Sequence, residues 1–318
     1  MAPQAAGDLI VLAIGGNSLI RDARHRTVPD QWAATRETCH GIADLIEAGH
    51  RVVVTHGNGP QVGFIVRRSE LGRGELHDVP LDSCDADTQG AIGYMIQQSL
   101  QNELMRRGVR KTAVTVVTQV EVDPADPAFA HPTKPIGSFM DQATATALAA
   151  REGWTVAEDA GRGWRRVVPS PRPKVILELD AIRDLVRLGY VVVGVGGGGI
   201  PVARGADGAL HGLEAVIDKD YASALLAVGL GADRLVVSTA VERVCLDYGT
   251  PAQRAIAAMT VREARAYAAA GHFAPGSMGP KIDAMVGFVE TTGHPATLTS
   301  PERLVAALAG DAGTTIRP

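Results

Sequence analysis

The sequence predicts an α/β fold in which a largely parallel sheet is covered by helices on both faces. Two observations carry this prediction. Short runs of β-branched residues alternate along the chain with segments whose apolar residues repeat every three or four positions. The chain has 318 residues, of which 46% are hydrophobic, so it can bury a large core. Strands that alternate with helices in this way form parallel sheets through right-handed crossovers.

The first part of this alternation ends near residue 117. A buried strand is expected at residues 8–14, which are apolar after the first residue. Trp32, Cys39 and Ile42 then mark one face of a helix that ends at Gly49. The next expected elements are a strand at 51–55, a helix at 91–104 and a strand at 112–117.

The alternation resumes in the second half of the chain. The expected elements there are a helix at 175–188, a strand at 190–195, a helix at 219–228 and a strand at 234–238. Ligands of such sheets bind at the carboxyl ends of the strands. We therefore expect the functional residues in the loops that follow the strands.

Residues 123–173 interrupt the alternation. This stretch contains seven prolines, and a short apolar helix is expected within it at residues 143–150. A connection of this length inside a compact domain is often a lid over an active site. Lys134 lies in it, so a lid would bring its own positive charge to a substrate. The alternative is a rigid excursion that carries a solvated lysine.

Charge and cysteine content exclude several classes of protein. The net charge of −4 gives no basic surface for nucleic acid or for an anionic membrane. Cys39, Cys84 and Cys245 are odd in number and widely separated, which predicts neither a disulfide framework nor a zinc site. The apolar run at residues 9–14 is too short to span a bilayer, and no positively charged segment precedes it. We expect a soluble, cytoplasmic protein.

Glycine-rich segments follow three of the expected strands. They are Gly15-Gly16-Asn17, Gly57-Asn58-Gly59 and the run from Gly196 to Gly199. Glycine lets the backbone approach a ligand closely and direct successive N–H groups at an anion, and a following helix N-terminus adds its positive end. Three such loops at three strand ends favour a phosphate-binding site over tight structural turns alone.

The chain contains only five lysines among its 31 basic residues. Because arginine has replaced lysine so widely, the remaining lysines are candidates for function. Lys134, Lys219 and Lys281 lie in segments typical of sites, whereas Lys111 and Lys174 begin apolar runs and are expected to be solvated ends of strands or helices. A compact ammonium on a flexible stem suits a moving phosphoryl group. Solvated surface lysines remain the alternative for each of the first three.

Two apparent motifs are set aside, and a third common motif is absent from the sequence. Residues 194–199 match the G-x-G-x-x-G spacing of a dinucleotide site, but Ile-Pro-Val follows at 200–202, where that motif requires a helix. No G-x-x-x-x-G-K-[ST] sequence of a P-loop occurs. Asp82, Asp85 and Asp87 lack the twelve-residue pattern of a calcium loop, and we expect them in a solvated loop.

Eight segments of the chain together resemble carbamate kinase. They are GGN (15–17), HGNGPQVG (56–63), TQG (88–90), PTKPIG (132–137), EDAGRGWR (158–165), VPSP (168–171), EAVIDKD (214–220) and GHFAPGSM (271–278). The resemblance covers nearly the whole chain in order. It is specific, because other amino-acid kinases, such as acetylglutamate kinase, share the fold but not these longer strings.

The resemblance implies a fold and a reaction. The fold is a homodimeric, open αβα sandwich with a mostly parallel central sheet and a protruding lid subdomain at about 123–173. The N-terminal lobe (1–190) would bind carbamate or carbamoyl phosphate, and the C-terminal lobe (191–318) would bind the nucleotide. The reaction is ATP + carbamate ⇌ ADP + carbamoyl phosphate with Mg²⁺, commonly run toward ATP at the end of the arginine deiminase route.

The resemblance also assigns roles to individual residues. Carbamoyl phosphate would be held by Gly15, Gly16, Asn17, Gly57, Asn58 and Gly59, and the nucleotide by Gly196, Gly197, Gly198, Pro275, Gly276, Ser277 and Met278. Lys219 and Lys281 would contact the transferred phosphoryl group, and Lys134 would reach in from the lid. Asp218 and Asp220 would orient the lysines and the water shell of the metal. Mg²⁺ would be held mainly by the nucleotide phosphates, with no side chain assigned as its ligand.

The chemistry of phosphoryl transfer agrees with these roles, because it demands positioning and cancellation of charge more than covalent catalysis. Asp87, Ala240, Arg243 and Gly279 differ from the residues usual in the family. Two alternatives stay open: another acyl-phosphate-forming amino-acid kinase, or a nonenzymatic metabolite sensor on the same fold. The presence of all three lysines argues against the sensor, since a sensor has no transition state to stabilise.

Overall fold

The computed structural model describes residues 7–16, 19, 20, 22, 24–159, 161 and 163–318. Its helices are α1 (Val28–Glu47), α2 (Gly59–Gly72), α3 (Leu81–Arg106), α4 (Gln142–Glu152), α5 (Leu179–Arg187), α6 (Lys219–Leu230), α7 (Val261–Ala269), α8 (Met278–Thr292) and α9 (Leu304–Ala309). Among the described residues, no helix combines the length and the apolar character needed to cross a membrane.

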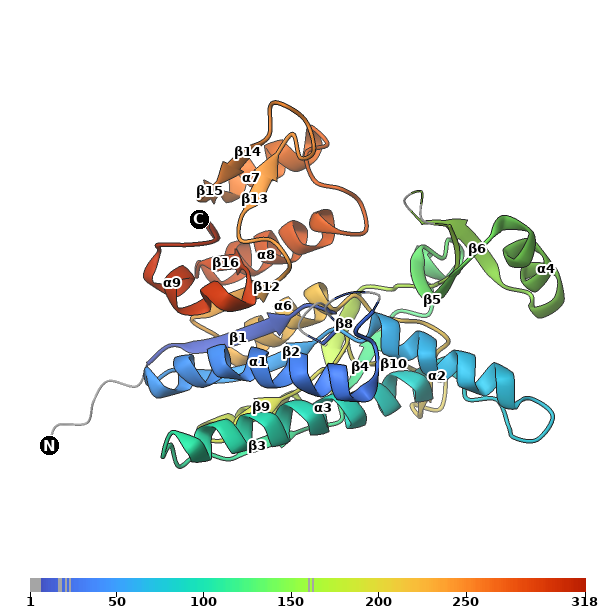
Figure 1. Ribbon diagram of the computed structural model, residues 1–318, viewed down its shortest axis with the longest axis horizontal. Helices are drawn as coiled ribbons and strands as arrows, with labels where there is room; N and C mark the ends of the chain where they lie inside the picture. The colour runs from blue at the N-terminus through green and yellow to red at the C-terminus, as the bar shows by residue number, and fades with distance from the viewer. Residues whose placement is uncertain (1–6, 17–18, 21, 23, 160, 162) are drawn as a thin grey trace, which may run out of the picture.

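An eight-stranded sheet forms the centre of the molecule, in the order β15-β17-β16-β12-β1-β2-β9-β3 (Figure 1). Its strands are β1 (Leu9–Ile14), β2 (Arg51–His56), β3 (Ala113–Thr115), β9 (Val191–Val193), β12 (Arg234–Ser238), β15 (Ala258–Thr260), β16 (Ala296–Thr299) and β17 (Thr314–Arg317). Neighbouring strands are parallel except for β16 and β17. The prediction of a mostly parallel sheet is therefore confirmed.

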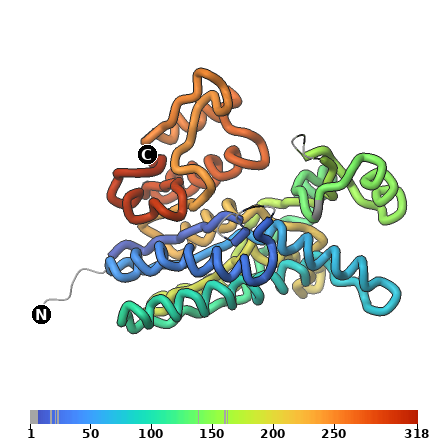
Figure 2. Tube along the Cα trace, in the orientation of Figure 1, coloured from blue at the N-terminus to red at the C-terminus, as the bar shows by residue number. Residues whose placement is uncertain are grey.

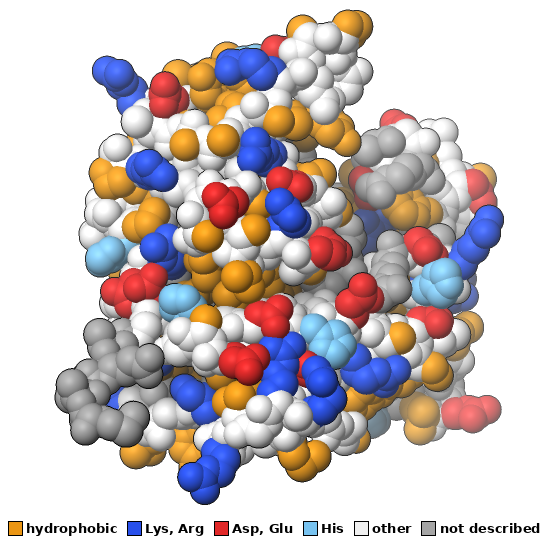
Figure 3. All heavy atoms as spheres, turned by 60° about the vertical axis from the view of Figure 1, so that its left-hand side comes forward, with side chains coloured by type: hydrophobic (Ala, Val, Ile, Leu, Met, Phe, Trp, Pro, Cys, Tyr) orange, Lys and Arg blue, Asp and Glu red, His pale blue; other side chains and the backbone are white. Residues whose placement is uncertain are grey.

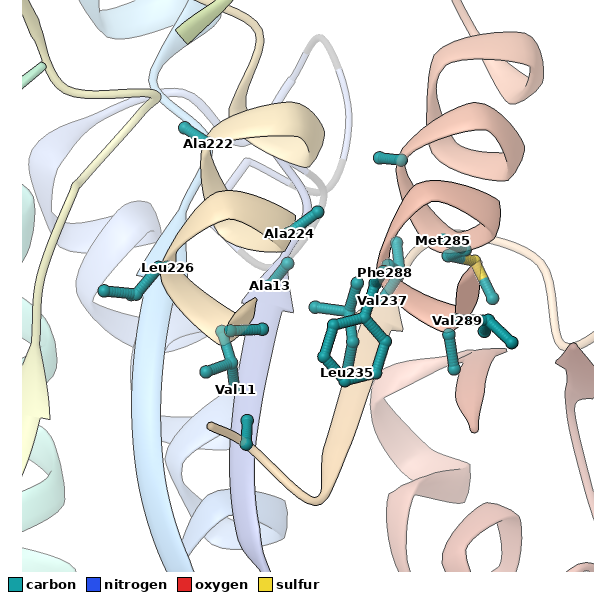
Figure 4. Packing of buried hydrophobic residues seen from close by; sticks show 14 of the residues in the cluster. Val11, Ala13, Ala222, Ala224, Leu226, Leu235, Val237, Met285, Phe288 and Val289 are labelled. Carbon is teal, nitrogen blue, oxygen red and sulfur yellow. The ribbon is translucent and has the colours of Figure 1, made fainter. Parts of the chain in front are cut away.

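Helices cover both faces of this sheet, as expected for an αβα sandwich. Ile10, Leu12 and Ile14 of β1 belong to a core that they share with α1 and α3. The alternate residues of the same strand, such as Val11, pack into a second core with α6 and α8. Figure 4 shows this second core, in which Phe288 of α8 lies beside β12. Burial on both faces explains why the strands read as continuous apolar runs.

Smaller sheets are attached to the central one. Their strands are β4 (Gln119–Val122), β8 (Pro173–Ile176), β10 (Ile200–Arg204) and β11 (Leu210–Gly212) in one sheet, β13 (Val244–Leu246) and β14 (Arg254–Ile256) in a hairpin, and β5 (Lys134–Met140), β6 (Thr155–Glu158) and β7 (Trp164–Val168) in another. The last three strands and α4 form a subdomain that protrudes from the body of the molecule (Figures 1 and 2). The structure thus confirms a protruding subdomain and the short helix predicted within it.

The protruding subdomain touches the body through a close crossing of α2 and β5. A Cβ added to Gly63 of α2 would lie 2.5 Å from the Cα of Gly137 in β5. That is far below a normal contact, so only glycine at position 63 allows the two backbones to approach this closely. The position of Lys134, at the start of β5, depends on this crossing.

Two predicted boundaries were wrong. The helix expected at 91–104 begins at Leu81, so Asp82, Asp85 and Asp87 lie on α3 and not in a solvated loop. The buried residues of α3 recur every three or four positions from Leu81 onward, and this periodicity outweighs the low helix propensity of aspartate. Asp85 is on the buried face.

The helix expected at 175–188 begins only at Leu179. Residues 174–176 belong instead to β8, where Val175 and Ile176 pair with β4. Branched side chains at these two positions favour a strand. By contrast, residues 200–204 form β10 directly after the glycines, which confirms that no dinucleotide-type helix opens there.

The division into an N-terminal and a C-terminal lobe at residue 190 stays a prediction. The central sheet is continuous across this point, because β9, which follows it, lies between β2 and β3. Figure 3 shows one face of the molecule, on which basic and acidic side chains are interspersed.

Candidate active site

The glycine loops after β1, β2 and β9 meet at the carboxyl ends of these strands. The backbone N–H of Gly57 donates to the carbonyl of Ile14 at 3.0 Å, and that of His56 donates to Gly196 at 3.1 Å. A Cβ added to Gly57 would lie 3.1 Å from the nitrogen of Gly16, so these two loops are in close contact. The predicted loops are therefore brought together, although Asn17 lies outside the described residues.

Asn58 is buried and its side chain points into the protein. Its Nδ2 donates to Oδ1 of Asp85 at 3.1 Å and to Oγ1 of Thr88 at 3.0 Å. The side chain also abuts Gly197, where an added Cβ would lie 2.1 Å from Asn58 Cγ. Both amide N–H groups are thus used within the protein and are not available to a ligand. Gly59 begins α2, whose N-terminus favours negative charge.

Asp218 links the protruding subdomain to the body. It is the N-cap of α6, and its Oδ1 accepts from the backbone N–H of Asp220 at 2.9 Å. Its Oδ2 accepts from Nζ of Lys134 at 2.6 Å. The preference of aspartate for N-cap positions explains the local geometry, and the cap turns the second oxygen toward Lys134.

Lys219 and Lys281 converge on a single carboxylate. Nζ of Lys219 lies 2.6 Å from Oδ1 of Asp220, and Nζ of Lys281 lies 2.8 Å from Oδ2. Lys219 and Asp220 are buried, whereas Lys281 is partly exposed. Two ammonium groups on one carboxylate leave a net positive charge at the N-terminus of α6, which is also its positive end.

Burial and the three charges shift the ionisation of this group. Burial lowers the pKa of Lys219, and the neighbouring Asp220 carboxylate opposes that shift. Burial alone would raise the pKa of Asp220, but the two ammonium groups hold it below its usual value. Asp220 is therefore ionised at neutral pH and keeps both lysines in place.

The two remaining lysines lie elsewhere, as expected. Lys174 is exposed in β8 and pairs with Asp123 at 2.6 Å. Lys111 lies just before β3 and is partly exposed. Neither is in contact with the ion pairs of Asp218 and Asp220, so the separation of the five lysines into two groups agrees with the structure.

His56 lies beneath the glycine loops and is completely buried. Burial lowers its pKa to about 4, and the positive charge of Lys219 acts in the same direction. Its Nε2 has no hydrogen-bond partner among the described residues. The imidazole is therefore neutral near pH 7 and adds no positive charge to the site.

A cavity of about 1140 Å³ opens beside Lys281. Its lining includes Thr239, Ala240, Arg243, Cys245, Tyr248, His272, Ser277, Met278 and Lys281. Ser277 and Met278 were predicted here, and Ala240 and Arg243 line it as well. Pro275 and Gly276 do not line the cavity, and neither do Gly196, Gly197 and Gly198, which lie beside the loop after β2.

Sequence reasoning missed several residues of this region. Tyr248 enters the cavity from the connection between β13 and β14, and His272 enters it from the segment before α8. His272 lies in the motif at 271–278, but no role was assigned to it. Asp85, which holds Asn58 together with Thr88, was placed in a solvated loop. Continuing the helical periodicity of α3 back to Leu81 would have placed Asp85 on the buried face.

The fold and the arrangement of charges define the class of protein. Residues 8–300 match the model of the amino acid kinase family. The chain is 49% identical over 312 residues to the carbamate kinase-like protein YahI of Escherichia coli, covering 97% of this chain and 98% of that protein. It is 46% identical over 312 residues to a carbamate kinase of Pyrococcus horikoshii, covering 97% and 99%.

Solved structures agree with these relatives. The carbamate kinase of Giardia lamblia bound to AMP-PNP superposes with a TM-score of 0.91 at 40% identity and covers 99% of both chains. This chain belongs to the amino acid kinase family and, within it, to the carbamate kinases, which are phosphotransferases. The resemblance seen in the sequence motifs is thereby confirmed.

Proposed function

We propose that this protein transfers a phosphoryl group reversibly between ATP and carbamate, with carbamoyl phosphate as the phosphorylated product. One observation carries the proposal: Lys219 and Lys281 share Asp220, at 2.6 and 2.8 Å, at the start of α6, and Ile217 just before α6 abuts Gly198 of the glycine loops. Such a cluster supplies positive charge for a phosphoryl group in transfer and contains no group that acts as a nucleophile.

Each part of the site has a task in this reaction. The backbone N–H groups of Asn58 and Gly59, at the N-terminus of α2, would bind the phosphate of carbamoyl phosphate. The ammonium groups of Lys219 and Lys281 would neutralise charge that spreads over the equatorial oxygens in the transition state. Asp220 would hold both lysines in position before the substrates arrive, so that little reorganisation is needed during transfer.

The nucleotide would occupy the cavity lined by Ser277 and Met278, with its terminal phosphate at Lys281. The Giardia relative that binds AMP-PNP supports a nucleotide as co-substrate. Mg²⁺ would enter with the nucleotide and neutralise its phosphates. The nucleotide phosphates would supply most of its ligands. Asp218 and Asp220 are the carboxylates near enough to the lysines to order its water shell.

The protruding subdomain is proposed to act as a lid. Lys134 is its contribution to the site, and its ion pair with Asp218 ties the subdomain to α6 at 2.6 Å. Binding of carbamoyl phosphate between the lid and the body would exclude water from the transfer. This role agrees with the two predicted lobes, of which the N-terminal one would bind carbamoyl phosphate and the C-terminal one the nucleotide.

A homodimer is proposed to form over the edge of the central sheet. Strand β3 ends the sheet, and the apolar side chains of Met105, Val117 and Leu188 nearby are 70%, 53% and 75% exposed. Covering such an edge protects its unpaired backbone groups. A cytoplasmic location and a physiological direction toward ATP, at the end of an arginine deiminase route, complete the proposed function.

The function is tested by incubating the purified protein with ADP and carbamoyl phosphate and measuring ATP. We expect magnesium-dependent ATP formation above the spontaneous decay of carbamoyl phosphate, and loss of activity when the metal is chelated. Acetyl phosphate and other acyl phosphates, offered in the same assay, test the alternative that the acceptor is a different carboxylate. Binding of the ligands without turnover would favour the sensor, and would rule out the kinase.

A further inference from the structure

A buried carboxyl group beneath the glycine loops has no task in the reaction proposed above. Asp85 lies on α3 and is 2% exposed. Its Oδ1 accepts from Nδ2 of Asn58 at 3.1 Å, and its Oδ2 is buried with no hydrogen-bond partner among the described residues. A carboxylate oxygen in this position is costly to ionise, whereas an O–H group carries no charge.

The charged surroundings of Asp85 do not compensate an ionised carboxylate. Lys134 of β5 acts on it with positive charge, but its Nζ is already paired with Asp218. Asp82 of α3 and Glu214, before α6, act on it with negative charge, and the adjacent Cys84 thiol stays neutral because burial raises its pKa to about 12. Burial, more than these charges, raises the pKa of Asp85 well above the usual value.

Asp85 is connected through the side chain of Asn58 to the loop proposed to bind phosphate. Asn58, which it holds, precedes the first residue of α2 and abuts Gly197 of the neighbouring loop. The second N–H of the amide is held by Thr88, one turn further along α3. The amide is thus fixed between α3 and the loops, and a change in the charge of Asp85 acts directly on the segment that would bind an anion.

We propose that Asp85 is a positioning residue that must carry a proton for carbamoyl phosphate to bind, so that its ionisation weakens the binding of this anion as the pH rises. The inference rests on the proposed function. In the protonated form, Oδ1 accepts from Asn58 and the proton resides on the unpartnered Oδ2. Loss of that proton places a negative charge behind the loop proposed to hold the phosphate. This charge repels carbamoyl phosphate, which is itself an anion, and weakens its binding.

The test compares Asp85→Asn with Asp87→Asn. Asparagine keeps an acceptor for Asn58 but cannot ionise, and Asp87 is an exposed carboxylate two residues away on the same helix. The KM for carbamoyl phosphate is measured from about pH 5 to about pH 9, the range in which buried carboxylic acids titrate. Ionisation of the substrate itself affects all the proteins alike.

We expect the KM of the wild type for carbamoyl phosphate to rise by up to about tenfold per pH unit above the pKa of Asp85, since only the protonated fraction binds. The KM for ADP should change much less. Asp85→Asn should lose this rise, and Asp87→Asn should keep it. A pH profile of Asp85→Asn that follows the wild type would overturn the proposal.

Unfolding by urea gives a second readout that needs no activity. Because the pKa of Asp85 in the folded protein lies above its unfolded value of about 3.9, the contribution of Asp85 to stability is fully present below about pH 3.9. It is lost as the pH rises from there through the folded-state pKa, since the unfolded chain releases the proton first. Asp85→Asn should therefore gain stability relative to the wild type as the pH rises, while Asp87→Asn should not. A pH-independent difference would show that Asp85 is ionised throughout and would refute the proposal.

The two readouts separate the proposal from the proposed function. A wild type without kinase activity would refute the function, and the unfolding series would still report the protonation state of Asp85. A pH-dependent stability difference without any change in the KM profile would show that Asp85 is only a buried structural acid, which would refute its positioning role. Both effects together are the expected result.

Discussion

Replacing Lys219 by methionine is expected to impair catalysis far more than folding. Methionine keeps the length and the apolar stem of lysine but removes the charge. In the wild type, Lys219 and Lys281 both donate to Asp220, at 2.6 and 2.8 Å, so the group carries one excess positive charge. After the replacement, Asp220 and Lys281 remain as a neutral pair, and no buried charge is left without a partner.

The magnitude follows from this balance of charges. Lys219 is costly to bury, as its lowered pKa indicates, and its removal recovers part of that cost. We expect the free energy of unfolding to fall by about 2 kcal/mol or less, because the lost ion pair is offset by the lost burial penalty. Asp220→Asn should cost roughly 3 to 5 kcal/mol, because two neighbouring ammonium groups then lose their shared counter-charge.

The effect on turnover should be larger. Lys219 is proposed to act on charge that develops in transfer, so the kcat for ATP formation should fall on the order of a hundredfold, equivalent to about 2.7 kcal/mol, with a smaller change in KM. Steady-state kinetics and urea unfolding of the same preparations measure both quantities. Lys174→Met is the control, because Lys174 makes an ion pair of the same length with Asp123 on the surface. An unchanged kcat for Lys219→Met, or a loss of stability as large as that of Asp220→Asn, would refute the role proposed for Lys219.

Two further predictions concern the protruding subdomain. Lys134→Ala should raise the KM for carbamoyl phosphate more than the KM for ADP. Hydrogen exchange across residues 123–173 of the wild type should slow when carbamoyl phosphate or a stable analogue binds. An exchange rate that does not change with ligand, together with an unchanged KM for Lys134→Ala, would refute a lid. Gly63→Ala should force α2 and β5 apart, since its Cβ would lie 2.5 Å from Gly137, and should raise the same KM. Gly287→Ala in α8, where an added Cβ meets nothing within 4 Å, should leave the KM unchanged, and equal behaviour of the two variants would count against the close crossing as the cause.

The sequence by itself determined the elements and the loops that matter. The apolar run of β1 and the helical periodicity of α1 are local patterns, and the glycines after β1, β2 and β9 stand where the backbone must turn at a strand end. The scarcity of lysine singled out Lys134, Lys219 and Lys281 before any contact was known. Motif similarity supplied the family, which the relatives then confirmed.

Only the tertiary structure decided which charged groups pair. Lys134 and Asp218 are 84 positions apart, and Lys281 and Asp220 are 61 positions apart, yet each pair is in hydrogen-bond contact. No local pattern specifies such contacts, because they depend on how the helices and strands pack around the sheet.

The burial of Asp85 is a second feature that the sequence did not predict. The acidic residues around it in the sequence suggested a solvated loop, but the packing of α3 against the body buries it. Its hydrogen-bond partner Asn58 is 27 positions away in the sequence. Sequence encodes the propensity and periodicity of each element, while burial depends on the neighbours that the fold supplies. The environment that raises the pKa of a carboxyl group is therefore a property of the assembled structure.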